Sequence, residues 1–262
     1  MASIEFTSHP LEFKKPAKTS RDTLKNKPSF FLSINDEKGQ TGTGECSLIP
    51  GLSLESEEDT RDALEKLTEH NFTSTASIPD SLPALKFAVE TALIDQKREG
   101  PPSWIDGITI NGLVWMDDAP AMLNQVDVLI EKGYKTIKLK VGTLPFYEEV
   151  DLLKEIRLRC PAPSFTLRID ANGAFSKQTP DGLSALEKLK VLHKAGLDLH
   201  SIEQPIAPGL INEMAELCAS SPVPIALDEE LIQIRTVADR RKLLEKIRPA
   251  YLVLKPSLLG GF

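Results

Sequence analysis

The sequence predicts an α/β fold in which helices cover a parallel sheet, preceded by a smaller α+β domain. Two observations support this. From about residue 105, short apolar runs of strand length alternate with helical patterns, and each pair occupies roughly 25 to 33 residues. Residues 1–50 instead alternate between apolar and polar side chains with turn residues in between, which is typical of an antiparallel sheet.

The composition is that of a globular protein and argues against several classes. Hydrophobic residues make up 41% of the 262 residues, which is enough for a sizeable core. The net charge of −7 argues against binding of nucleic acid or an anionic membrane, because both need a basic surface. There is neither a signal-peptide pattern nor an apolar run of about eighteen residues. The three cysteines form no CxxC pair, so we expect neither disulfides nor structural zinc, and a cytoplasmic location.

The first 102 residues are expected to form an α+β capping domain. Strands are predicted over residues 4–13, 29–34 and 41–46, and helices over residues 57–70 and 82–97. The stretch from Phe13 to Pro28 is basic and rich in hydroxyl groups, so we expect a mobile loop that serves as a lid. The run Gly100-Pro101-Pro102 marks the boundary with a second domain over residues 103–262.

The second domain is predicted to consist of strand and helix pairs. The strands are expected over residues 108–114, 136–141, 165–169, 199–203, 224–227 and 251–255, and the helices over residues 120–132, 146–160, 179–195, 211–220 and 236–246. Such pairs form either an open doubly wound sheet or a barrel. Their even spacing favours the barrel, whose strands all end at one mouth. No GxGxxG or GxxxxGK[ST] motif follows any strand, so a nucleotide-binding fold has no support.

Two lysines in one apolar strand are the first sign of a functional site. Lys138 and Lys140 are two residues apart, so their side chains point to the same face of the strand. Two ammonium groups in a core need carboxylates opposite them. Later strands end in such groups, at Asp170, Glu203 and Asp228.

Three carboxylates that converge from neighbouring strands would form an oxygen-rich cage for a hard cation, Mg²⁺ or alternatively Mn²⁺. Asn172, two residues after Asp170, faces the same mouth and could orient a ligand. Glu229 and Glu230 follow Asp228 directly and compete with it for the role of ligand; Glu229 is expected just outside the ligand set. A small-molecule carboxylate on the metal would present its α-proton to a lysine base.

Five short motifs resemble, in order and spacing, the muconate-cycloisomerase-like subgroup of the enolase superfamily. They are the lysine pair of residues 138 and 140, Asp170-Ala171-Asn172, Glu203-Gln204-Pro205, Asp228-Glu229 and Lys255-Pro256. The resemblance implies a TIM-like (β/α)7β barrel whose mouth is closed by the capping domain. It also implies that Asp170, Glu203 and Asp228 bind Mg²⁺, and that lysine α-proton abstraction yields a metal-stabilised enediolate.

Within that superfamily, the stretches LEFKKPAKTSR, GECSLIPGLS and INGLVWM are most similar to the o-succinylbenzoate synthases of menaquinone biosynthesis. Those enzymes dehydrate 2-succinyl-6-hydroxy-2,4-cyclohexadiene-1-carboxylate to 2-succinylbenzoate. The resemblance implies that Lys140 is the base, that Lys255 stabilises the enediolate from the opposite face, and that Lys138 assists by its charge. Ser20 and Arg21, in the expected lid, would cover the succinyl side of the substrate.

Several alternatives stay open at this point. The same constellation serves N-succinylamino acid racemases and dipeptide epimerases, and Lys255 could instead be a Schiff-base lysine of an aldolase-like barrel. A family barrel needs two further strand and helix pairs after Lys255, so we expect a chain truncated after the sixth strand, either part of an active synthase or an inactive remnant. Arg168 and His200 are expected to be surface or structural residues. The sequence leaves the oligomeric state undecided.

Overall fold

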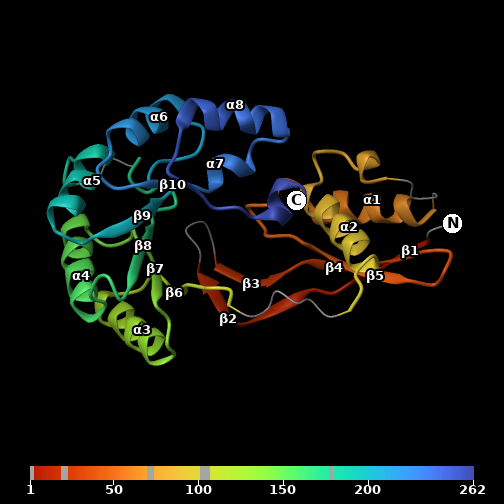
Figure 1. Cartoon of the computed structure of the whole chain (residues 1–262), viewed down its shortest axis with the longest axis horizontal. Helices are drawn as coiled ribbons and strands as arrows, with labels where there is room; N and C mark the ends of the chain where they lie inside the picture. The colour runs from red at the N-terminus through yellow and green to blue at the C-terminus, as the bar shows by residue number, and fades with distance from the viewer. Residues whose placement is uncertain (1–2, 19–22, 70–73, 101–106, 177–179) are drawn as a thin grey trace. The chain divides into compact units, whose positions relative to one another are not determined.

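A computed structural model describes residues 3–18, 23–69, 74–100, 107–176 and 180–262 (Figure 1). The chain divides into two compact units. The first contains residues 1–105, 232–237 and 254–262, and the second contains residues 106–231 and 238–253. Two short segments that the sequence analysis placed in the second domain, residues 232–237 and 254–262, thus group with the first unit.

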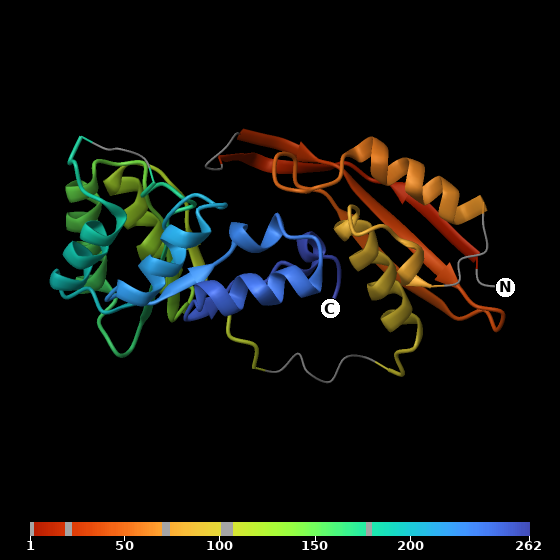
Figure 2. The same ribbon diagram turned by 90° about the horizontal axis from the view of Figure 1, so that it is seen from above.

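The first unit is built on an antiparallel sheet. Its strands, in spatial order, are β1 (Ser3–Ser8), β4 (Ser29–Asn35) and β5 (Thr41–Ser47). Helices α1 (Glu57–Glu69) and α2 (Pro83–Gln96) pack on this sheet, as Figures 1 and 2 show, and η1 (Thr75–Ser77) lies between them in the chain. Alternate residues of β4, among them Leu32 and Ile34, are fully buried in the core. Both predicted helices are confirmed.

Two glycines of β5 allow α2 to lie directly against the sheet. A Cβ atom at Gly44 would lie 1.9 Å from the carbonyl oxygen of Ala88, and one at Gly42 would lie 1.9 Å from that of Ala92. Both oxygens belong to the backbone of α2 and cannot move aside. Only glycine is therefore compatible with this close approach.

The prediction of an irregular loop between Phe13 and Pro28 was wrong. Strands β2 (Leu11–Lys18) and β3 (Thr23–Lys27) pair antiparallel as a two-stranded sheet. No side chain whose burial is described in β2 or β3 is buried. Pro16 lies where the register shifts between Glu12 and Ala17, a place where a missing N–H is tolerated. The strand predicted over residues 4–13 is accordingly divided between β1 and β2. Ser20 and Arg21 lie outside the described residues.

The second unit contains a six-stranded parallel sheet whose strands lie side by side in chain order. They are β6 (Gly112–Val114), β7 (Thr136–Lys140), β8 (Thr166–Asp170), β9 (Leu199–Glu203), β10 (Ile225–Leu227) and β11 (Tyr251–Leu252). A doubly wound sheet would reverse direction part of the way along this order. The consecutive order is that of a barrel wall, which confirms the predicted fold class. β6 is shorter than predicted, since Ile108 and Ile110 lie outside it and are exposed.

Helices follow the strands as predicted, with a few differences. They are α3 (Ala119–Glu131), α4 (Phe146–Arg159), α5 (Ala185–Lys194), α6 (Ile211–Ser220), α7 (Glu229–Ile232), α8 (Val237–Ile247) and α9 (Pro256–Leu259). Figure 1 shows α3 to α6 along one side of the sheet. Helix α5 begins later than predicted because Ser184 and Glu187 form a capping box. The short helices α7 and α9 were not predicted.

The side chains that face these helices form the core of the second unit. Ile137 and Leu139 of β7 are fully buried, and Leu167 and Ile169 of β8 continue the same row. The residues between them point to the opposite face, where the charged groups lie. Within the described ranges of the chain, no helix has the length and apolar character needed to cross a membrane.

Candidate active site

The register of β7, β8 and β9 brings three charged residues into one row. Lys140 lies opposite Asp170, and Asp170 lies opposite Glu203, each at the carboxyl end of its strand. Residues paired across parallel strands point to the same face of the sheet, and Lys138, two residues before Lys140, shares that face. The predicted lysine pair therefore meets two of the three predicted carboxylates, Asp170 and Glu203.

The side chains in this row are in direct contact. The Lys138 ammonium group lies between two carboxylates, 3.0 Å from Asp170 Oδ2 and 2.5 Å from Glu203 Oε2. Lys140 Nζ lies 3.1 Å from Asp170 Oδ2 and donates a hydrogen bond to Asn172 Oδ1 at 2.7 Å. Asn172 Nδ2 in turn donates to Glu229 Oε1 at 2.9 Å. Asn172 was predicted to orient a ligand; in the structure its side chain orients Lys140.

Burial and mutual charge shift the pKa values of these groups. Burial lowers the pKa of Lys138, but the charges of Asp170 and Glu203 outweigh it and raise that pKa above its usual value. Burial raises the pKa of Asp170, but the two lysines outweigh it, and the pKa is lowered. Burial and the negative charge of Asp170 raise the pKa of Glu203 to about 7, against the effect of Lys138 and with a further contribution from Asp228. The Glu203 carboxylate is therefore repelled by Asp170 and, to a smaller extent, by Asp228.

Asp228 and the two glutamates after it follow β10, the neighbour of β9. Asp228 is buried, and its backbone N–H donates to Gln204 Oε1 at 3.3 Å. Glu229 contacts Asn172, whereas the Glu230 carboxylate accepts a hydrogen bond from the backbone N–H of Gly209 at 2.9 Å. The three consecutive acidic residues thus face three different surroundings.

The chemistry of these donors fits a hard divalent cation. Asp170, Glu203 and Asp228 offer carboxylate oxygens from three adjacent strands, and their repulsion at Glu203 would be relieved by a positive charge. In the part of the chain that the structure describes, no three His, Cys, Asp or Glu side chains are already arranged as a metal site. The Lys138 ammonium group instead supplies the positive charge between Asp170 and Glu203.

One arginine of this face was misjudged from the sequence. Arg168 is not a helix-face or surface charge, because it lies on β8 opposite Lys138 of β7 and Ser201 of β9. A hollow of about 270 Å³ on this face is lined by Arg168, Lys138 and Glu203 among others. The alternation of β8 could have shown this, since Arg168 is two residues before Asp170. His200 lines the same hollow and stacks on the Tyr251 ring, 4.5 Å between centroids.

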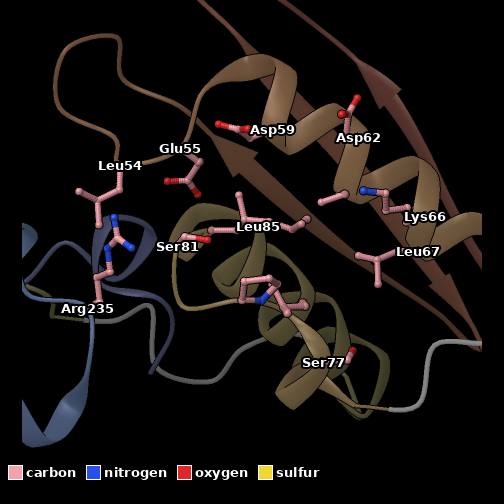
Figure 3. Close-up of a pocket in the computed structure, with 14 residues that line it drawn as sticks. Leu54, Glu55, Asp59, Asp62, Lys66, Leu67, Ser77, Ser81, Leu85 and Arg235 are labelled. Atoms are coloured by element: carbon pink, nitrogen blue, oxygen red, sulfur yellow. The ribbon is translucent and has the colours of Figure 1, made fainter.

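A larger hollow, of about 760 Å³, lies in the first unit between α1 and α2 (Figure 3). Figure 3 shows Glu55, Asp59 and Lys66 around it. It contains none of the predicted site residues. Its buried acid, Glu55, accepts a hydrogen bond from the backbone N–H of Ala84 in the first turn of α2, which is a helix-capping role. We therefore place the chemistry at the sheet of the second unit.

Three further predicted residues lie outside the second unit or outside the described residues. Lys255 belongs to the first unit, where it immediately precedes α9. Its predicted place opposite Lys140 stays a prediction. The same holds for Ser20 and Arg21, which lie outside the described residues.

Comparisons with known proteins agree with the fold. A family profile described as Enolase C-terminal domain-like matches residues 121–262. The o-succinylbenzoate synthase of Desulfotalea psychrophila is 39% identical over an alignment of 301 positions, which covers 99% of this chain and 79% of that protein. The crystal structure of MenC from the same organism superposes with a TM-score of 0.80 at 36% identity, covering 100% of this chain and 80% of that one.

A second similar structure contains a bound metal. The o-succinylbenzoate synthase of Thermosynechococcus elongatus BP-1, complexed with Mg in its active site, superposes with a TM-score of 0.83 at 26% identity. The match covers 98% of this chain and 77% of that one.

Proposed function

Because this chain belongs to the enolase superfamily, we propose that it is an o-succinylbenzoate synthase of menaquinone biosynthesis. The reaction removes the α-proton and the hydroxyl group of 2-succinyl-6-hydroxy-2,4-cyclohexadiene-1-carboxylate as one molecule of water and leaves 2-succinylbenzoate. The observation that carries the proposal is the contact of Lys140 with Asp170 and Asn172 beside two further buried carboxylates. The similarity to o-succinylbenzoate synthases over nearly the whole chain supports it.

Lys140 is the proposed base. Lys138 is less suited to that role, because the raised pKa of its ammonium group holds the proton that a base must lack. The hydrogen bond from Lys140 to Asn172 fixes the direction of its amine. After it has taken the α-proton, Lys140 is the group that can donate this proton to the departing hydroxyl.

Asp170, Glu203 and Asp228 are the proposed ligands of Mg²⁺. When bound, the cation would supply positive charge that stabilises the negative charge developing on the substrate carboxylate. Lys138, which pairs with two of these ligands, limits their repulsion and adds positive charge at the same place. Glu229 holds Asn172, and through it Lys140, in position.

Three further assignments in this proposal rest on the family resemblance. Lys255 stabilises the enediolate from the face opposite Lys140, and Ser20 and Arg21 cover the succinyl group. From these assignments we expect Lys255→Ala to lower kcat. Arg21→Ala should chiefly raise KM, because the succinyl group is remote from the reacting atoms.

The test is turnover of the cyclohexadiene substrate by the purified chain, with 2-succinylbenzoate measured by chromatography. We expect turnover that EDTA abolishes and that Lys140→Ala reduces by about 10² to 10⁴-fold, the usual contribution of a general base. Lys154→Ala, on the exposed side of α4, is the matched control and should retain full activity. Absence of turnover by a folded, Mg²⁺-loaded chain would refute the proposal, as would faster α-proton exchange on an N-succinylamino acid, which indicates a racemase.

A further inference from the structure

We infer that Gln204 and Glu230 form a positioning pair that holds two of the proposed metal ligands, Glu203 and Asp228, at a fixed separation. This inference rests on the proposed metal site. Gln204 directly follows Glu203 at the end of β9, and Glu230 lies two residues after Asp228 at the end of β10. Each partner is therefore attached through the backbone to one ligand.

The contacts between the two residues are reciprocal. Gln204 Oε1 accepts hydrogen bonds from the backbone N–H groups of Asp228 at 3.3 Å and Glu230 at 3.2 Å. In the other direction, Gln204 Nε2 donates to Glu230 Oε2 at 3.4 Å and to the carbonyl oxygen of Ile206 at 2.9 Å. One amide group thus spans the carboxyl ends of two strands.

The backbone of Gln204 is held as tightly as its side chain. Its N–H donates to the carbonyl oxygen of Ala226 at 2.9 Å, and its carbonyl oxygen accepts from Gly173 at 2.7 Å. Gln204 has φ of 40°, a left-handed conformation that a non-glycine residue adopts only where its surroundings impose it. The residue has no exposed surface, so each of these bonds replaces a contact with water.

The same contacts separate Glu230 from the ligand set. Glu230 Oε1 accepts from the N–H of Gly209 at 2.9 Å, and Oε2 faces the Gln204 amide. Both oxygens of Glu230 are therefore engaged by hydrogen bonds from Gly209 and Gln204. Of the three consecutive acidic residues, Asp228 is left as the ligand, Glu229 positions Asn172, and Glu230 positions Gln204.

The decisive measurement is Mg²⁺ affinity by calorimetry, without substrate, in the full chain. Gln204→Met keeps the volume of the side chain but leaves the N–H groups of Asp228 and Glu230 without their acceptor. We expect Mg²⁺ binding about 10 to 100-fold weaker, as for other residues that orient metal ligands, and kcat that recovers at saturating Mg²⁺. The control Ser221→Ala removes two local side-chain hydrogen bonds to the backbone of Val223, which precedes β10, and should leave the affinity unchanged.

A second pair of variants decides the question if Gln204→Met does not fold. Gln204→Glu places two carboxylates together and should weaken Mg²⁺ binding. The double variant Gln204→Glu with Glu230→Gln restores one acceptor and one donor at the contact and should regain most of the affinity. Failure of the double variant to regain it would overturn the inference.

Glu230→Gln alone separates positioning from ligation. This substitution keeps the hydrogen bond from the backbone N–H of residue 230 to Gln204 Oε1. It should therefore lower the Mg²⁺ affinity less than Asp228→Asn does. An equal or larger loss would make Glu230 a ligand and overturn the inference. Unchanged affinity in Gln204→Met would overturn it too, while the proposed function stood. A chain that binds Mg²⁺ but turns over no cyclohexadiene substrate would refute only the proposed function.

Discussion

The two faces of the six-stranded sheet both contain buried residues, but they are built from opposite chemistry. The face toward the helices is apolar; its buried residues include Val114, Ile137, Leu139, Leu167, Ile169, Ile202, Ile225 and Leu227. The other face carries Lys138, Lys140, Asp170 and Glu203, of which the two acids are more than nine-tenths buried. Burying apolar groups stabilises a fold, whereas burying charges costs free energy that only partners or function can offset. The polar face is therefore where activity is expected, and the apolar face is where stability is expected.

The largest expected effect is at Asp170, which contacts both lysines. Asp170→Asn removes a proposed ligand and the charge opposite Lys138 and Lys140. We expect turnover to fall more than about 100-fold, since even residues that only orient ligands cost up to that amount. Steady-state kinetics with Mg²⁺ titration measures it. Turnover equal to that of the wild type would show that Asp170 is not part of the active site.

The apolar face of the sheet is tested at Leu167, three residues before Asp170 on β8. Leu167→Ala opens a cavity under the helices, and we expect the free energy of unfolding to fall by about 2 to 5 kcal/mol. Urea denaturation measures this loss. The activity of the remaining folded protein should stay within about threefold of the wild type. A variant of unchanged stability but low activity would contradict the division of roles between the faces.

A pH titration sharpens the comparison on the polar face. The pKa of Glu203 is raised to about 7, so below that pH a proton must leave before Glu203 can bind a cation. Mg²⁺ affinity should rise up to about tenfold per pH unit from pH 6 to 7 and level off above, with proton release seen by calorimetry in two buffers. Affinity that is constant across this range would show that Glu203 is not a ligand.

The raised pKa of Glu203 also affects stability, which should fall with rising pH, whereas Mg²⁺ affinity should rise. Without metal, the folded state holds a proton on Glu203 that the unfolded state has released between its ordinary pKa of 4.5 and about 7. The contribution of Glu203 to the free energy of unfolding therefore decreases as pH rises through this window. Glu203→Gln should remove this part of the pH dependence, as thermal unfolding at several pH values would measure.

The smallest effect is expected on the outer side of the helical layer. Lys154 and Asp151 form an ion pair of 2.8 Å on α4, with both side chains more than half exposed. Such pairs contribute less than about 1 kcal/mol. Lys154→Ala should change neither Tm by more than a few degrees nor activity. A large loss would mean that the outer surface of α4 has a role beyond solvation.

The alternation of strands and helices, and the residues that end each strand, follow from the order of residues alone. Side chains on a strand alternate with period two, so Lys138 and Lys140 had to share a face, and strand and helix pairs of even length had to bring Asp170 and Glu203 to one edge. These are consequences of local geometry, which the order of residues encodes directly.

Features that depend on pairing between distant segments emerge only once the chain is folded. The β2–β3 hairpin has little buried apolar surface, so no strong alternation announced it. The surroundings of Arg168 and the contacts that distinguish Asp228, Glu229 and Glu230 follow from register across neighbouring strands. Register is set by long-range packing and hydrogen bonding. It is this register that gives three consecutive acidic residues different surroundings.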